Sequence, residues 1–204
     1  SLASRQSGTA GTATASVAWQ PSGGHCMGAA RFGATVADRI TVPTAGISAS
    51  AGTAMVWARL DATQPSRTRY LFGHTGLPSF RERIQLYMDS NDEQLDLGLG
   101  DSHRVHENIA TLARGVWLHV ALTWNGGQYR VVVDGTSRAT GTYSGLTALR
   151  AVAAFGATGE ELGDENEAFA GLLDEARLYG GALSVADVQL ASGICITPPP
   201  TAAP

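Results

Sequence analysis

The chain has 204 residues, with 18 acidic and 14 basic side chains, 25 glycines and two cysteines. Its formal net charge of −4 argues against general nucleic-acid binding, which needs a basic surface. No apolar run approaches the length of a membrane span. The length suits one domain with a sizeable core, and the basic residues, all arginine, indicate a GC-rich bacterial genome.

Low-complexity segments at both ends of the chain frame one predicted domain. Residues 1–16 are small and polar, too poor in apolar side chains to order themselves. Residues 197–204 read TPPPTAAP, a proline-rich sequence typical of a semi-rigid linker between modules. We therefore expect a single domain over residues 17–196, belonging to a larger secreted or cell-surface protein.

Short strand-like segments dominate this domain, and turn residues separate them. In chain order they are Arg39–Val42, Thr53–Leu60, Tyr70–Phe72, Ile84–Met88, Gln94–Leu99, Val116–Trp124, Gln128–Val133 and Leu172–Tyr179. The turns Asn125-Gly126-Gly127 and Asp134-Gly135 predict two tight hairpins. Only Ser184, three residues before Asp187, indicates a helix, which would end near Gly193. This pattern is typical of a sandwich or jelly roll, so the predicted fold class is all-β.

The two cysteines, Cys26 and Cys195, bracket almost the whole predicted domain. They are either a disulfide or two unrelated buried thiols. We favour the disulfide because both flank glycine-rich segments, and a disulfide would indicate an oxidising compartment.

Adjacent carboxylates lie inside the apolar strand Leu172–Tyr179. Asp174 and Glu175 would be costly in a half-buried strand unless they were paired or bound to a cation. An ion pair with Arg177 or Arg39 is one solution, and a bound metal ion is the other.

Three ordered motifs resemble one family. The segment GVWLHVALTWNGGQYRVVVDGT (115–136) is similar to the W-x-H-V-A-x-T-(Y/W)-(D/N)-G core of laminin-G-like domains in the concanavalin A-like lectin/glucanase superfamily. ARFGATVADRITVP (30–43) and FAGLLDEARLYGGALSVADV (169–188) resemble the opening and closing motifs of the same family. The resemblance implies a jelly roll of two antiparallel sheets, one of them concave. It also implies that the terminal strands are neighbours, which would place Cys26 beside Cys195.

The same resemblance implies a calcium ion as a structural cofactor. In related domains the aspartate matching Asp174 often ligates calcium with backbone carbonyls from the first strand, here around Gly33. Asp38 stands where the family has an acidic pair. One carboxylate with carbonyls and water would give a weak or structural site. The ion pair with an arginine remains the alternative.

Alternation places a polar set on one face of the central strand around Ile84–Met88, where sugar-binding relatives often hold ligand. The set comprises Arg81, Arg83, Gln85 and Tyr87, with Arg69 and His74 from the preceding segment as an extension. Guanidinium and amide donors suit sugar oxygens, and an aromatic ring can stack on a sugar. A solvated outer face of the sandwich would show the same alternation.

The segment DSHRVHEN carries a second polar group. His103 and His106 resemble a metal pair, but zinc needs three or four converging ligands, and an i, i+3 pair on a strand points to opposite faces. We therefore interpret His103, Arg104 and His106 as side chains of a carbohydrate-binding loop. The acidic run 160–167 fits a solvated loop better than a calcium loop, because the D-x-D-x-D-G spacing is missing.

The lack of known catalytic motifs in the sequence favours a binding module over an enzyme. The E-x-D-x-(x)-E strand of the superfamily's glucanases and a G-x-S-x-G nucleophile motif are both missing from the sequence. We predict a non-catalytic, lectin-like module with a glycan partner. The alternative is an adhesion or structural module that binds protein. The weakest hypothesis is a lyase or hydrolase that uses Arg83, Gln85, Tyr87 and His106.

Overall fold

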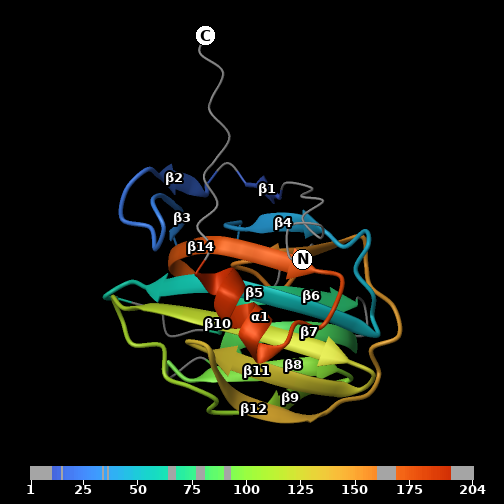
Figure 1. Cartoon of the computed structure of the whole chain (residues 1–204). Helices are drawn as coiled ribbons and strands as arrows, with labels where there is room; N and C mark the ends of the chain where they lie inside the picture. Colours follow the sequence, from blue (N-terminus) through green and yellow to red (C-terminus); the bar gives the residue numbers. More distant parts are fainter. Residues whose placement is uncertain are drawn as a thin grey trace.

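The computed structural model describes residues 11–14, 16–33, 35, 37–63, 68–76, 81–89, 93–159 and 169–193. These residues form two antiparallel seven-stranded sheets that pack face to face, with one helix outside them (Figure 1). The predicted all-β jelly-roll sandwich is therefore confirmed. No helix in these ranges is long and apolar enough to cross a membrane.

Each sheet contains strands from both halves of the chain. Sheet A has the order β1 (Thr12–Ala13), β4 (Ile40–Pro43), β13 (Val152–Phe155), β6 (Arg69–Gly76), β7 (Arg81–Met88), β8 (Leu95–Gly100), β9 (Ser102–His106). Sheet B has the order β12 (Thr136–Thr142), β11 (Gln128–Val133), β10 (Trp117–Asn125), β5 (Ala51–Leu60), β14 (Ala170–Tyr179), β3 (Ala29–Gly33), β2 (Ala18–Gln20). Both predicted hairpins are present, because Asn125 pairs with Gln128 and Val133 with Thr136.

The core lies between the sheets and follows from two-residue alternation along the strands. On β5 the inward side chains are Ala54, Val56, Ala58 and Leu60, and on β7 they are Ile84, Leu86 and Met88. Trp124 is the fully buried tryptophan, and its Nε1 donates to the Ser48 carbonyl at 3.2 Å. Gly52 gives this ring its space, because a Cβ there would lie 2.2 Å from the Trp124 ring.

Helix α1 (Val185–Ser192) covers the outer face of sheet B. Met55 and Ala121 of the sheet pack with Val188 and Ala191 of the helix in a second apolar cluster. Ser184 and Asp187 form the predicted capping box. The cap satisfies backbone N–H groups that the first helical turn leaves free.

Candidate functional site

The adjacent carboxylates of β14 lie at a β-bulge. The register between β14 and β5 shifts between Asp174 and Arg177, and Glu175 has a φ of 50°. The bulge keeps Glu175 beside Arg177, and the two side chains form an ion pair in which each is only 6% exposed. Arg177 also donates to the Ala191 carbonyl near the end of α1. For Glu175, the ion-pair interpretation is therefore correct.

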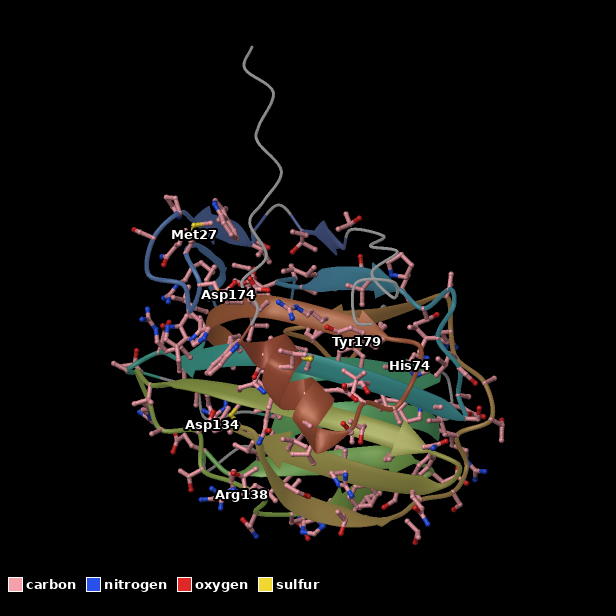
Figure 2. The ribbon with its side chains drawn as sticks, viewed as in Figure 1. Met27, His74, Asp134, Arg138, Asp174 and Tyr179 are labelled. Carbon is pink, nitrogen blue, oxygen red and sulfur yellow. The ribbon has the colours of Figure 1, made fainter. Side chains whose placement is uncertain are left out.

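Asp174 binds backbone N–H groups. Its Oδ2 accepts from Cys26 N at 3.0 Å, and its Oδ1 accepts from Glu175 N at 2.8 Å. Figure 2 shows Asp174 below the 21–28 loop. Gly33 pairs with Ala170, four residues before Asp174, which corresponds to about 13 Å along a strand. The structure does not bring Asp174 and Gly33 together as one calcium site.

Asp38 acts as the acceptor of a local turn beside Gly33. Its Oδ2 accepts from Gly33 N at 2.6 Å, and its Oδ1 accepts from the Thr35 hydroxyl at 2.7 Å. Burial alone would raise the pKa of this carboxyl, but hydrogen bonds from Ser16, Thr35 and Gly33 outweigh burial and lower it. No group of three or more His, Cys, Asp or Glu side chains suited to a metal ion occurs in the described ranges. Calcium binding stays a prediction.

The loop that carries Cys26 packs near the end of α1. His25 stacks on Trp57 with ring centroids 3.5 Å apart, and Trp57 Nε1 donates to the Ser192 carbonyl at 3.1 Å. Cys195, three residues beyond Ser192, lies outside the described residues, as does the acidic run 160–167. The disulfide therefore stays a prediction.

The outer face of sheet A contains the polar set around β7. Arg83, Gln85 and Tyr87 alternate with the core residues Ile84 and Leu86, as predicted. Arg81 is exposed and lies beyond an irregularity at Glu82, whose φ is 58°. The alternation therefore extends from Arg83 to Tyr87 and stops before Arg81.

Residues 101–104 cover part of this face, and we name them the 101–104 arch. The Tyr87 hydroxyl donates to the His103 carbonyl at 3.0 Å, and the His103 ring stacks on Tyr87 with centroids 4.8 Å apart. Arg83 Nη1 donates to the Asp101 carbonyl at 2.9 Å. Under the arch, Tyr87 is 0% exposed. The face is therefore not an open solvated surface.

Gln85 lies between the arch and a second covering segment, residues 157–159. The backbone of this segment runs over Gly73, where a Cβ would lie 2.3 Å from the Ala157 carbonyl oxygen. Gln85 Nε2 donates to the Thr75 hydroxyl at 2.7 Å, and that hydroxyl donates to the Thr158 carbonyl at 3.1 Å. Gln85 is 3% exposed, and its Oε1 has no hydrogen-bond partner among the described residues.

His74 does not extend the binding face, so that expectation is wrong. The ring is buried, its Nδ1–H donates to the Glu82 carbonyl at 2.8 Å, and its Nε2 accepts from Arg150 N at 2.8 Å. Both ring nitrogens are hydrogen-bonded to backbone groups, and burial lowers the pKa of the ring. Arg69 is buried as well, 3.9 Å from Glu93. Neither side chain is available to a ligand at the surface.

The DSHRVHEN segment divides between the two sides of β9. His103 lies on the outer face over Tyr87, whereas His106 Nδ1 lies 3.0 Å from the Tyr129 hydroxyl between the sheets. Arg104 is exposed and pairs with Asp89 at 2.6 Å and with Glu107 at 2.7 Å. Burial lowers the pKa of His103, and the charges of Arg83 and Arg104 lower it further. These effects favour the neutral form of His103. Of the three side chains, only those of His103 and Arg104 belong to the outer face.

The structure does not bring together the residues that the lyase hypothesis requires. The lyase hypothesis needs His106 beside Tyr87, but these side chains lie on opposite sides of the sheet. Burial raises the pKa of the Tyr87 phenol, so it stays protonated at neutral pH. Glu82 accepts hydrogen bonds from Thr147 and from Ala148 N, so its carboxylate is engaged away from this face.

Comparisons with known proteins agree with the fold. The laminin G 3 family, described as the concanavalin A-like lectin/glucanases superfamily, matches residues 33–189. No curated protein sequence matches the chain. Among solved structures, domain 4 of AbnA, a GH43 extracellular arabinanase from Geobacillus stearothermophilus in complex with arabinotriose, superposes with a TM-score of 0.67 at 21% identity, covering 91% of this chain and 90% of that one.

Two more distant structures share the architecture. The binding domain of Paraclostridial Mosquitocidal Protein 1 has a TM-score of 0.66 at 14% identity, over 88% of this chain and 46% of that one. A heptameric SAP-like pentraxin from Limulus polyphemus has a TM-score of 0.53 at 20% identity, over 73% and 70%. These likenesses concern the fold, and the family match covers most of the chain. The chain belongs to the laminin-G-like family of the concanavalin A-like lectin/glucanase superfamily.

Proposed function

We propose that the chain is a non-catalytic glycan-binding module of a larger secreted or cell-surface protein. The observation that carries the proposal is the outer face of sheet A, where Arg83, His103 and Tyr87 meet and Arg81 and Arg104 are exposed nearby. Guanidinium groups present several donors to sugar oxygens, and an aromatic ring provides a flat surface on which a sugar can stack. The arabinotriose bound by the similar arabinanase domain supports a glycan ligand on this fold.

Retention on immobilised polysaccharides tests this proposal. Affinity electrophoresis through neutral and acidic polysaccharides should retard the chain, and Arg83→Ala should reduce that retardation. Arg138→Ala is the matched control, because Arg138 is an exposed arginine on β12 of the other sheet (Figure 2). An equal effect of both substitutions, or no retardation by any polymer, would count against the proposal.

A protein-binding adhesion module is the second candidate. Trp19 and Met27, on the 18–33 hairpin, are large apolar side chains that are 63% and 50% exposed. Exposed apolar groups of this size often mark protein contacts. Two results together would support this candidate. The chain would bind no polysaccharide, and sedimentation would show self-association that Trp19→Ser abolishes.

Two structural features belong to the proposal. We propose a Cys26–Cys195 disulfide, supported by the contacts that join the Cys26 loop to the end of α1 through Trp57. A structural calcium ion at Asp174 is proposed from the family resemblance, since each carboxylate oxygen that accepts a backbone N–H keeps a further lone pair. An oxidising compartment outside the cell would suit the disulfide.

A further inference from the structure

The side-chain amide of Gln85 is oriented by its neighbours. Thr75 Oγ1 donates its hydrogen to the Thr158 carbonyl, so toward Gln85 it can only accept, and Nε2 faces it at 2.7 Å. The acceptor Oε1 must then face the opposite way, toward Gly98. A Cβ atom added to Gly98 would lie 2.9 Å from Gln85 Oε1. A buried acceptor without a donor carries a free-energy cost. Gln85 Oε1 is therefore an acceptor that could be satisfied by an incoming donor.

The 101–104 arch occupies the space beside this acceptor. The His103 carbonyl lies 2.8 Å from the position of a Cβ on Gly98, and the His103 ring covers Tyr87 in a parallel stack. A parallel ring on an aromatic side chain is the arrangement that a bound sugar ring adopts. His103 thus occupies the stacking position that a ligand would need.

The arch is attached to the sheet by little strand pairing and by polar and aromatic side-chain contacts. Strand β9 is an edge strand, and its pairing with β8 is limited to Leu97 with His106 and Leu99 with Ser102, with an irregularity between them. Beyond that pairing, the described contacts of the arch with the outer face include the hydrogen bonds from Tyr87 to the His103 carbonyl and from Arg83 to the Asp101 carbonyl. The His103 ring also stacks on Tyr87, and Arg104 pairs with Asp89 at 2.6 Å. Asp101 N also donates to the Ser144 carbonyl at 3.0 Å, which anchors the start of the arch.

We infer that the 101–104 arch is a displaceable cover, and that a glycan which displaces it donates a hydroxyl hydrogen to Gln85 Oε1. This inference rests on the proposed glycan-binding function and identifies its ligand as neutral at this position. A carboxylate would face the Gln85 acceptor with no hydrogen to donate, and it would approach Asp96, which pairs with Tyr87 on the neighbouring strand. A sugar hydroxyl supplies the missing donor without added charge.

Binding of variants to neutral polymers tests the inference. The chain is titrated with soluble arabinan and galactan, and with polygalacturonate as the carboxylated counterpart of galactan. Gln85→Met should weaken binding to the neutral polymers about 5–10-fold, the value of one neutral hydrogen bond. Gln94→Met is the control, because Gln94 makes a similar hydrogen bond to Thr111 at 2.9 Å outside the site.

Two further measurements test the cover directly. Tyr87→Phe keeps the ring but removes the hydrogen bond that holds the arch at His103, so it should tighten binding and accelerate association. Amide hydrogen exchange at residues 102–104 should change when the polymer binds. Gly98→Ala places a methyl group against Gln85 Oε1 and should abolish binding. This variant replaces Gln85→Met in the test if Gln85→Met fails to fold.

The outcomes separate this inference from the proposed function. If the unaltered chain binds a polysaccharide but Gln85→Met binds equally well, the inference is wrong and the proposed function stands. Preference for polygalacturonate that disappears in high salt would also overturn it, as would unchanged or weaker binding by Tyr87→Phe. If no polysaccharide binds the unaltered chain, both proposals fail together.

Discussion

Acid should destabilise this domain through His119. The ring projects from β10, is 1% exposed, and has no hydrogen-bond partner on either nitrogen among the described residues. Trp57 packs against it with centroids 5.2 Å apart. Burial lowers the pKa of His119 from 6.5 to about 4, and the charges of Arg177 and His25 add to the decrease.

The size and sign of the effect follow from the two pKa values. Above pH 6.5 the imidazole is neutral in both the folded and the unfolded chain, so it contributes no pH dependence. Between pH 6.5 and 4 the unfolded chain binds a proton that the folded chain excludes. The free energy of unfolding then falls by about 1.4 kcal/mol per pH unit, or roughly 3 kcal/mol in all. That is a large part of the roughly 5–15 kcal/mol typical of a domain.

Urea unfolding at pH 7, 5.5 and 4 measures this contribution. His119→Leu removes the titrating group and the two unpartnered nitrogens, and the other ionisable groups largely cancel when the two chains are compared. We expect the stability difference between variant and unaltered chain to grow by about 3 kcal/mol in favour of the variant from pH 7 to pH 4. If the free energies of unfolding of the variant and the unaltered chain change equally with pH, the assigned burial and charge environment of His119 is refuted.

Three other predictions concern the closure of the sandwich. Arg177→Met removes the buried ion pair with Glu175 and should cost about 3–5 kcal/mol in urea unfolding, whereas Glu175→Gln with Arg177→Met together should cost less. Thiol titration of the unreduced, denatured chain should find no free thiol, and reduction should lower stability by about 4 kcal/mol; two titratable thiols would exclude the disulfide. Calcium at 100 times its dissociation constant should stabilise the domain by about 2.7 kcal/mol, and chelator should reverse this effect. If neither calcium nor chelator changes the melting temperature, calcium binding is excluded.

The sequence predicts what depends on local periodicity. Two-residue alternation places Arg83, Gln85 and Tyr87 on one face, and the glycine turns locate the hairpins. The short polar strands β9 and β12 escape prediction because they have too few apolar side chains for a clear pattern. The role of His74 also escapes, because it depends on a backbone hydrogen bond to a residue 76 positions away.

The bulges are the second kind of feature that pattern reasoning misses. Glu82 and Glu175 both adopt positive φ, which a glutamate rarely does, and neither is flanked by a turn signal that would reveal it. At Glu82 the irregularity separates Arg81 from the alternation that includes Arg83. At Glu175 it places two consecutive carboxylates beside different partners, which explains how an apolar strand accommodates both.

The two outer faces of the sandwich differ in how they are covered, and this difference favours sheet A as the binding face. On sheet B, α1 buries an apolar cluster that includes Met55 and Val188, and each such fully buried side chain contributes about 1.5–3 kcal/mol. On sheet A, the arch is held against the outer face by hydrogen bonds from Arg83 and Tyr87, by the His103–Tyr87 stack and by the exposed Arg104–Asp89 ion pair. Each of these contacts is worth about 0.5–3 kcal/mol. A ligand can replace hydrogen bonds of that size with its own, but it cannot replace the apolar burial under α1. Binding by displacement of a cover is therefore feasible on sheet A and not on sheet B.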